Sequence, residues 1–244
     1  NIAVGHALDW FFIVLTAMLL VASLIVVPLV AETSRVMWVV VTATVSLLLL
    51  LLTCSIYTHG RWFFVASSGC VLGISVVFAP FVIAPLCRET KLERHRAALA
   101  VLWDTIWLYL LLTACGVYIH GDAVYWYMAM TISTYIVVLV WIYVFIVSYG
   151  KGNGQIRAGI LVAVSGIWIG MANDVMNFFL APVGADDGYG LGSLDLSRGF
   201  RFDDIAVLNA NLLFAIIVVS VCVGGVMIFS GLIKEKRVDD NEKD

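Results

Sequence analysis

Two carboxylates lie inside long apolar stretches, where an ionised side chain is costly. Asp104 follows the basic end of its stretch by about eight residues and is flanked by Trp103 and Trp107, and Asp174 lies in a later stretch. A carboxylate within a membrane costs on the order of 3 kcal/mol unless it is paired, protonated or hydrated, and it commonly marks a functional site. Both are therefore candidate intramembrane ionisable sites. For Asp104, the alternative is a protonated or Thr-bonded side chain that holds helices together.

Amide side chains accumulate around Asp174. One stretch carries Asn173, Asp174 and Asn177, and the next begins with Asn209 and Asn211. Positions 174 and 177 share a helix face, because residues three apart are neighbours on a helix surface. The functional interpretation is a cavity that opens to the outer side and binds a polar or cationic ligand. The alternative is interhelical hydrogen bonding, which contributes about 0.6 kcal/mol per bond in membranes.

Three histidines lie beside apolar stretches, each close to a glycine and a tryptophan: His6 with Trp10, His59 with Trp62, and His120 with Trp126. Histidine is a common metal ligand and titrates near neutral pH, so this outer-rim repeat could bind a metal or sense protons. However, no carboxylate recurs beside the histidines. The alternative is a repeated turn in which glycine caps the helix and tryptophan anchors it at the membrane interface.

Signatures of catalysis are missing from the sequence. It has no His-Glu-x-x-His, Gly-x-Ser-x-Gly or P-loop motif, and its five cysteines form no CxxC pair. We therefore predict no catalytic residue, no metal site and no cofactor, and the protein is not expected to be an enzyme. The basic residues fall in short clusters, so nucleic-acid binding by this region is not expected either.

The elements that must position these residues are long and apolar. Apolar residues make up 62% of the 244-residue chain and charged residues 13%, far from the balance of a soluble domain. A bilayer core of about 30 Å requires about 20 apolar residues per helix, and backbone groups in lipid must be satisfied within the segment. The sequence therefore predicts an all-α integral membrane protein in which the lipid bilayer is the main partner. The seven expected spans are 9–31, 36–58, 62–87, 97–119, 124–148, 156–180 and 206–233.

Lysine and arginine set the expected orientation. With the N-terminus outside, the inner segments hold 11 of these residues and the outer segments hold three, Arg61, Arg198 and Arg201. The positive-inside rule therefore predicts an outer N-terminus and an inner C-terminus. The transmembrane domain is expected over 1–234, with a long extracytoplasmic loop at 181–205 and a charged cytoplasmic tail at 235–244. The expected location is the cell membrane, as a multi-pass protein.

Two features predict how the helices are built and packed. Residues Cys54 to Gly60 match Cys115 to Gly121 at an offset of 61 residues, which suggests a duplicated two-helix hairpin. Small residues four apart, at Gly69 with Gly73 and at Gly166 with Gly170, predict close approach of neighbouring helices. Pro80 and Pro85 are expected to break the hydrogen-bond ladder of the third span, which makes either a hinge or a bend.

Three segments carry a resemblance to a known group of proteins. They are the opening Asn-Ile-Ala-Val-Gly-His-Ala-Leu-Asp-Trp, the apolar run that follows it to Pro28, and the stretch from Ser75 to Pro85 with Arg94-His95-Arg96 beyond it. These segments resemble uncharacterised multi-pass membrane regions of Gram-positive bacterial proteins. Such regions often stand behind an N-terminal helix-turn-helix or zinc-ribbon domain. The resemblance implies a membrane-embedded sensory or anchoring region attached to a cytoplasmic module. The chain begins with Asn1 and not Met, so we expect a fragment or processed chain with such a module upstream.

Three functions are compatible with these features. The leading hypothesis is a bacterial sensory or anchoring domain that binds a ligand or partner from the outer side, through the Asn and Asp residues around position 174 and the 181–205 loop. The second is a small-molecule or ion-coupled transporter subunit that uses Asp104 and Asp174 as inner and outer stations for an ion. The third is a structural subunit of a larger membrane complex, in contact with other membrane subunits.

Overall fold

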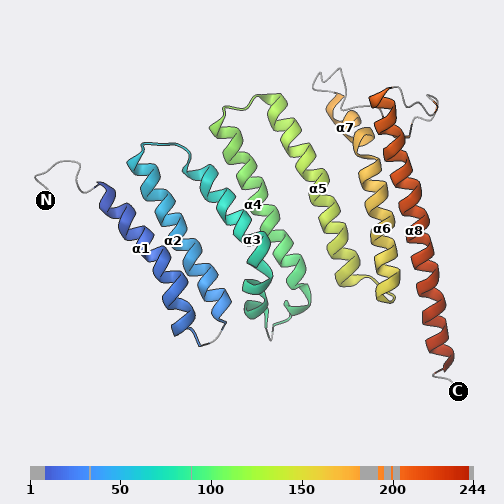
Figure 1. Ribbon diagram of the computed structural model, residues 1–244, viewed down its shortest axis with the longest axis horizontal. Helices are drawn as coiled ribbons and strands as arrows, with labels where there is room; N and C mark the ends of the chain where they lie inside the picture. Colours follow the sequence, from blue (N-terminus) through green and yellow to red (C-terminus); the bar gives the residue numbers. More distant parts are fainter. Residues whose placement is uncertain are drawn as a thin grey trace, which may run out of the picture. The chain divides into compact units, whose positions relative to one another are not determined.

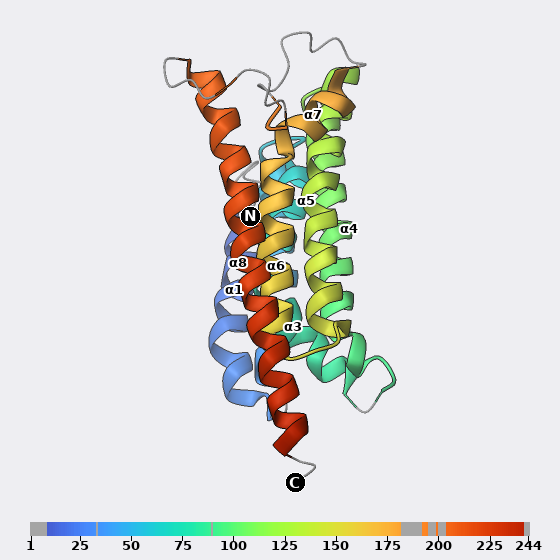
Figure 2. The same ribbon diagram turned by 90° about the vertical axis from the view of Figure 1, so that its right-hand side faces the viewer.

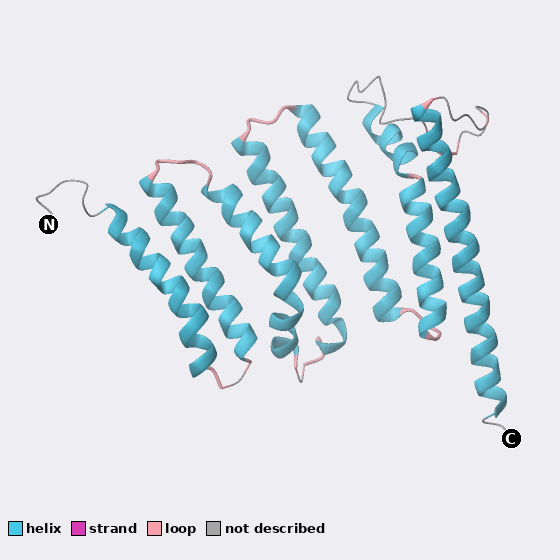
Figure 3. Ribbon diagram, in the orientation of Figure 1, coloured by secondary structure: helices cyan, strands magenta, loops and turns pink. Residues whose placement is uncertain are grey.

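The described part of the chain folds into helices and the loops between them, as Figure 3 shows. The computed structural model describes residues 9–32, 34–88, 90–181, 192–194, 199 and 204–241. Of these described residues 87% are helical, and none is in a strand. The helices are α1 (Asp9–Val30), α2 (Arg35–Tyr57), α3 (Phe63–Cys87), the short η1 (Glu93–His95), α4 (Arg96–Tyr118), α5 (Ala123–Tyr149), α6 (Gly154–Gly170), α7 (Ala172–Leu180) and α8 (Ile205–Asn241). The predicted all-α class is confirmed.

The long helices match what a membrane requires. Six are long and apolar enough to span a bilayer, and α6 with α7 makes a seventh span if this bent pair crosses as one unit. At most 22% of the apolar window of each of these six helices is buried inside the structure. Most of their apolar surface is therefore exposed, as at Leu29 and Phe145. Lipid is the solvent that makes such exposure favourable, which supports a multi-pass membrane protein.

The chain divides into two compact units, Asn1–Asp122 and Ala123–Asp244. In the first unit α1 packs against α2, α3 packs against α4, and α2 contacts α3 (Figure 1). The hydroxyls of Thr16 and Thr53 lie 3.2 Å apart across the contact between α1 and α2. Pro80 and Pro85 do not interrupt α3, which continues through both.

In the second unit α6 and α8 run side by side (Figure 2). A Cβ atom added to Gly159 would lie 2.7 Å from the carbonyl oxygen of Gly224, and one added to Gly224 would lie 2.6 Å from that of Gly159. Added Cβ atoms at Gly166 and Gly170 would likewise collide with Ser220 and Ile217, at 2.0 and 2.2 Å. Close packing at this pair is confirmed.

The predicted glycine contact on α3 is wrong. A Cβ atom on Gly69 would meet only a Leu111 methyl at 3.7 Å, and one on Gly73 would meet nothing within 4 Å. Spacing alone identifies a small-residue surface, but a second helix must face it before the backbones can approach.

Two expected elements have different limits in the structure. The stretch 156–180, expected as one helix, is two helices that meet at Met171 with a bend of 49°. The last span was expected over 206–233, whereas α8 runs over 37 residues to Asn241. The charged segment 235–241 therefore continues α8 as helix, and residues 242–244 lie outside the described part.

Candidate functional site

Asp104 has a partner on the neighbouring helix. The Ser75 hydroxyl on α3 donates a hydrogen bond to the Asp104 carboxylate on α4, and Ser75 is 7% exposed. The hydroxyl of Thr105 bonds instead to the carbonyl of Val101 on its own helix. Asp104 thus joins α3 to α4 through a serine, 29 residues away, that the sequence analysis had not paired with it.

Two tryptophans flank Asp104 on α4. The rings of Trp103 and Trp107 meet edge to face, with their centroids 5.9 Å apart. The indole nitrogen of Trp107 is buried and has no hydrogen-bond partner among the described residues. Such a buried donor costs free energy unless a further group bonds to it. Around this position the Asp104 carboxylate therefore has a hydrogen-bond partner, whereas the Trp107 indole N–H has none among the described residues.

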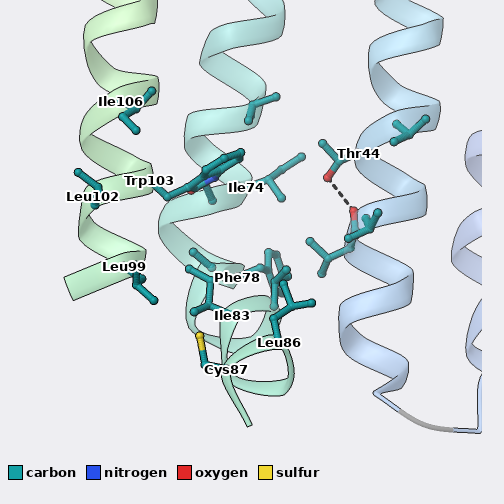
Figure 4. Close-up of a pocket in the computed structure, with 17 residues that line it drawn as sticks. Thr44, Ile74, Phe78, Ile83, Leu86, Cys87, Leu99, Leu102, Trp103 and Ile106 are labelled. Carbon is teal, nitrogen blue, oxygen red and sulfur yellow. Dashed lines mark hydrogen bonds between the residues drawn. The ribbon is translucent and has the colours of Figure 1, made fainter. Parts of the chain in front are cut away.

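An apolar groove of about 530 Å³ lies beside the Ser75–Asp104 contact. Helices α2, α3 and α4 line it, and Ser75 is part of its wall. In Figure 4 Ile106 lies at the upper end of the lining, Trp103 and Ile74 lie nearer its middle, and Leu86 and Cys87 lie at the lower end. The lining is almost wholly hydrocarbon, so the groove suits an apolar chain or ring better than a polar solute.

Asp174 holds a segment of the connection between α7 and α8. The backbone N–H and the hydroxyl of Ser193 both donate to Asp174 Oδ2, over 2.9 and 2.8 Å, and Ser193 is 2% exposed. A Cβ atom on Gly192 would lie 2.3 Å from Asp174 Oδ1, so only glycine allows the loop to approach this carboxylate. Asp174 therefore joins α7 to residues 192–194.

The amides predicted around Asp174 are in different environments. Asn173 and Asn177 on α7 are half-buried, and each takes part in a further interaction. On α8 Asn209 is exposed, whereas the amide nitrogen of Asn211 is buried without a hydrogen-bond partner in the described part of the chain. A shared ligand site formed by these residues stays a prediction. Most of the 181–205 loop lies outside the described residues.

A second pocket lies at the bend between α6 and α7. It has a volume of about 540 Å³ and is lined by α5, α6 and α7. Tyr135 and Trp168 stack in its wall with ring centroids 4.6 Å apart, and the Trp168 indole donates to the Tyr135 carbonyl at 3.2 Å. Met171, at the bend itself, also lines this pocket. Its lining is mainly apolar and aromatic, in contrast to the polar amides nearby.

The outer-rim histidines His59 and His120 end two helices in the same way. Both have positive φ, 51° and 53°, and both side chains are exposed. At each end the next residue, Gly60 or Gly121, donates its N–H to the carbonyl five residues earlier, over 3.0 and 2.8 Å. This pattern is a Schellman motif with histidine, and not glycine, in the left-handed position.

That geometry corrects the expected role of the glycine. Gly60 follows the left-handed residue, and Trp62 folds over it: an added Cβ would lie 2.3 Å from the Trp62 indole nitrogen, so a larger residue would displace that side chain. Trp10 is exposed near the start of α1, Trp126 is half-buried on α5, and His6 lies outside the described residues. A metal site at this rim stays a hypothesis, since the described residues contain no group of three metal-binding side chains.

Arginines at the opposite helix ends were missed by the sequence analysis. The Arg35 side chain donates to the Ala31 carbonyl at 2.8 Å, just beyond α1. Arg157 donates to the carbonyls of Val147, in the last turn of α5, and Gly152, over 3.1 and 3.2 Å. Each thus satisfies a carbonyl at the end of the preceding helix. Arg35, Arg96 and Arg157 are spaced 61 residues apart, the same offset as the histidine turns, and this spacing was the available signal.

The chain matches no family model, and no curated protein or solved structure shows significant similarity to it. The fold and the two sites therefore define it only as a helical protein with several membrane-compatible helices.

Proposed function

We propose that this protein is a membrane-embedded sensory or anchoring domain that binds a ligand or partner from the outer side, and that the Ala123–Asp244 unit does the sensing. The observation that carries the proposal is the pocket at the bend between α6 and α7. An occupant of this pocket would contact α5 on one side and both arms of the bend on the other. Binding there would favour one angle of the bend over another, and such differential affinity is what a sensor requires.

The contacts of Asp174 and of α8 support a way for a conformational change at this pocket to reach the inner side of the membrane. Asp174 follows Met171 on α7 and holds Ser193 of the outer loop. The glycine contacts fix α6 to α8 at backbone distance, so these two helices move as one body. A helix of 37 residues is about 55 Å long, well beyond the bilayer core of about 30 Å. Motion of the α6–α8 pair against α5 would therefore reach the charged inner end of α8.

The orientation within this proposal follows from charge. The N-terminus lies outside and the C-terminus inside, because 11 of the 14 basic residues then fall on the inner side. The proposal places the protein in a bacterial cell membrane with seven spans, α6 and α7 forming one of them. The 61-residue repeat supports a duplicated hairpin, since α2 and α4 both contain 23 residues, begin with arginine, and end in the same turn.

The proposal is tested by filling the pocket at the bend. Val175 lines this pocket, whereas Phe178, on the same helix, is 76% exposed and does not line it. Spin labels at Phe145→Cys on α5 and Glu235→Cys on α8 report the distance between the inner ends of these helices in nanodiscs. The background replaces the five native cysteines, Cys54, Cys70, Cys87, Cys115 and Cys222.

We expect Val175→Trp to shift the mean distance between the labels by about 1–2 Å, the range of helix shifts in signalling proteins. Phe178→Trp adds a similar aromatic group outside the pocket and should leave the distance unchanged. Asp174→Ala should broaden the distance distribution, because it releases Ser193. An unchanged distance in Val175→Trp, or an equal shift in both tryptophan variants, would refute sensing and leave only anchoring.

Ion-coupled transport is the second candidate, and the bent α6–α7 pair favours it. In transporters, discontinuous helices commonly bind substrates or coupling ions near the middle of the membrane. In this function Asp104 and Asp174 would each release their serine partner to bind an ion. Flux into proteoliposomes that disappears in Asp104→Asn and in Asp174→Asn would support transport, and flux that persists in both would refute it.

A further inference from the structure

The apolar groove of the first unit leads to a basic loop. Leu86 and Cys87 line the groove on α3, and Leu99 lines it on α4. The connection between them borders an open polar pocket of about 570 Å³, lined by Thr90, Lys91, Glu93, Arg94 and Arg96. Only two residues separate Cys87 from Thr90, and only two separate Arg96 from Leu99. A single elongated molecule can therefore contact both cavities.

Thr90 fixes the turn in this loop. Its hydroxyl donates to the Cys87 carbonyl at 2.7 Å and accepts the Leu92 N–H at 3.3 Å. The side chains of Lys91, Arg94 and Arg96 are exposed, and no ion pair with another described residue engages them. Residues 88–96 contain four basic and two acidic side chains, so the mouth of the groove carries net positive charge.

We infer that this region binds one anionic phospholipid, with an acyl chain in the groove and the phosphate against Lys91, Arg94 and Arg96. The groove favours hydrocarbon over a polar solute, and the basic loop favours an anion over a neutral lipid. The acyl chain gives little selectivity, because hydrocarbon in the bilayer is as apolar as the groove wall. The phosphate must therefore supply the preference. This site is independent of the sensory proposal for the other unit.

The headgroup is tested by native mass spectrometry of the full chain in a neutral detergent. Phosphatidylglycerol and phosphatidylcholine with identical acyl chains are titrated separately. Each basic side chain near a membrane surface changes affinity for an anionic lipid about fivefold. We expect the triple variant Lys91→Gln, Arg94→Gln, Arg96→Gln to lose phosphatidylglycerol affinity on the order of 100-fold. Its phosphatidylcholine affinity should not change.

The matched charge control is the triple variant Lys234→Gln, Lys236→Gln, Arg237→Gln. These residues are exposed at the inner end of α8 and lie outside both cavities. This control should retain the phosphatidylglycerol affinity of the wild type. Equal binding of the two lipids to the wild type would overturn the proposal. An equal loss in the two triple variants would overturn it too, because attraction would then depend only on total charge.

The acyl chain is tested by filling the groove. Ile83→Trp places a large ring inside it, whereas Val77→Trp adds the same ring at an exposed position on α3 that does not line it. We expect Ile83→Trp to weaken phosphatidylglycerol binding at least tenfold, by about 1.4 kcal/mol or more, and Val77→Trp to leave it unchanged. Inorganic phosphate at millimolar concentration should not displace the lipid. Displacement by phosphate, together with unchanged binding in Ile83→Trp, would show a free-phosphate site and refute the lipid.

Discussion

In the Asn1–Asp122 unit, α3 and α4 are joined by the Ser75–Asp104 contact beside an open groove, whereas in the Ala123–Asp244 unit α6 and α8 meet at backbone distance. The difference arises from side-chain size at the contact. Gly159 and Gly224 let two backbones touch, while the groove is lined by large residues such as Phe78 and Trp103. Close contact leaves no space between α6 and α8, whereas looser contact leaves a groove beside α3 and α4.

The largest effect is expected where α6 and α8 touch. Gly224→Leu would place a side chain against the Gly159 carbonyl at 2.6 Å and the Ala163 Cβ at 2.8 Å. The helices would have to separate, and overpacking of this kind costs about 3 kcal/mol. The free energy of unfolding, measured by steric trapping in bicelles, should fall by that amount.

Gly225 gives the matched control on the same helix. A Cβ at this position meets nothing within 4 Å, so Gly225→Leu should raise stability by up to about 1 kcal/mol through helix propensity. Gly73→Leu on α3 should behave like Gly225→Leu for the same reason. If Gly73→Leu destabilised the protein as strongly as Gly224→Leu, the contrast between the two units would be wrong.

A smaller effect is expected at the polar contact of the first unit. Ser75→Ala leaves the Asp104 carboxylate without its partner on α3, which costs about 1–2 kcal/mol. Asp104→Leu removes both the carboxylate and the need for the hydroxyl. In a double-mutant cycle, the two substitutions should therefore be coupled by about 1 kcal/mol. Additive effects would show that the contact does not stabilise α3 against α4.

Most helix positions could be predicted from the sequence because the bilayer imposes one length and one polarity on every span. The expected spans 36–58 and 97–119 differ from α2 and α4 by a single residue at each end. Local sequence patterns were less reliable for hydrogen bonds whose two residues lie far apart in the chain. Nothing near Asp174 or Asp104 specifies Ser193 or Ser75, which are 19 and 29 residues distant.

The bend at Met171 was missed for a related reason. It contains no proline, so the stretch 156–180 reads as one uninterrupted apolar helix. The bend is supported by tertiary contacts, including the Asp174–Ser193 hydrogen bonds, and these do not appear as a local sequence pattern. The glycine at the histidine turns was predicted to cap the helix, whereas in the structure histidine takes the left-handed position of the cap.

Arginine side chains cap a helix end in each unit. Arg157 of the second unit bonds to two carbonyls, and Arg35 of the first unit bonds to one. Arg157→Gln should therefore cost about 1 kcal/mol and Arg35→Gln about half of that. Arg157→Lys keeps the charge but loses the planar fork, and it should recover only part of the loss. Thermal unfolding in detergent measures all three, and equal losses at the two arginines would contradict this ranking.

The smallest effect is expected at the histidine turns, and it has the opposite sign. A non-glycine residue in the left-handed region costs about 1 kcal/mol, which His59→Gly removes. Glycine also increases the entropy of the unfolded chain, which offsets about half of that gain. The net stabilisation should therefore be about 0.5 kcal/mol, and His59→Ala should give no gain because alanine keeps the strain.

His120→Gly should raise the stability by the same amount as His59→Gly, because the two turns share one hydrogen-bond pattern. The double variant should add the two gains, since independent sites are additive. Thermal midpoints in detergent give the comparison. A loss of stability in either glycine variant would mean that the exposed imidazole makes a stabilising contact within the protein, and that contact would contradict the predicted relief of strain.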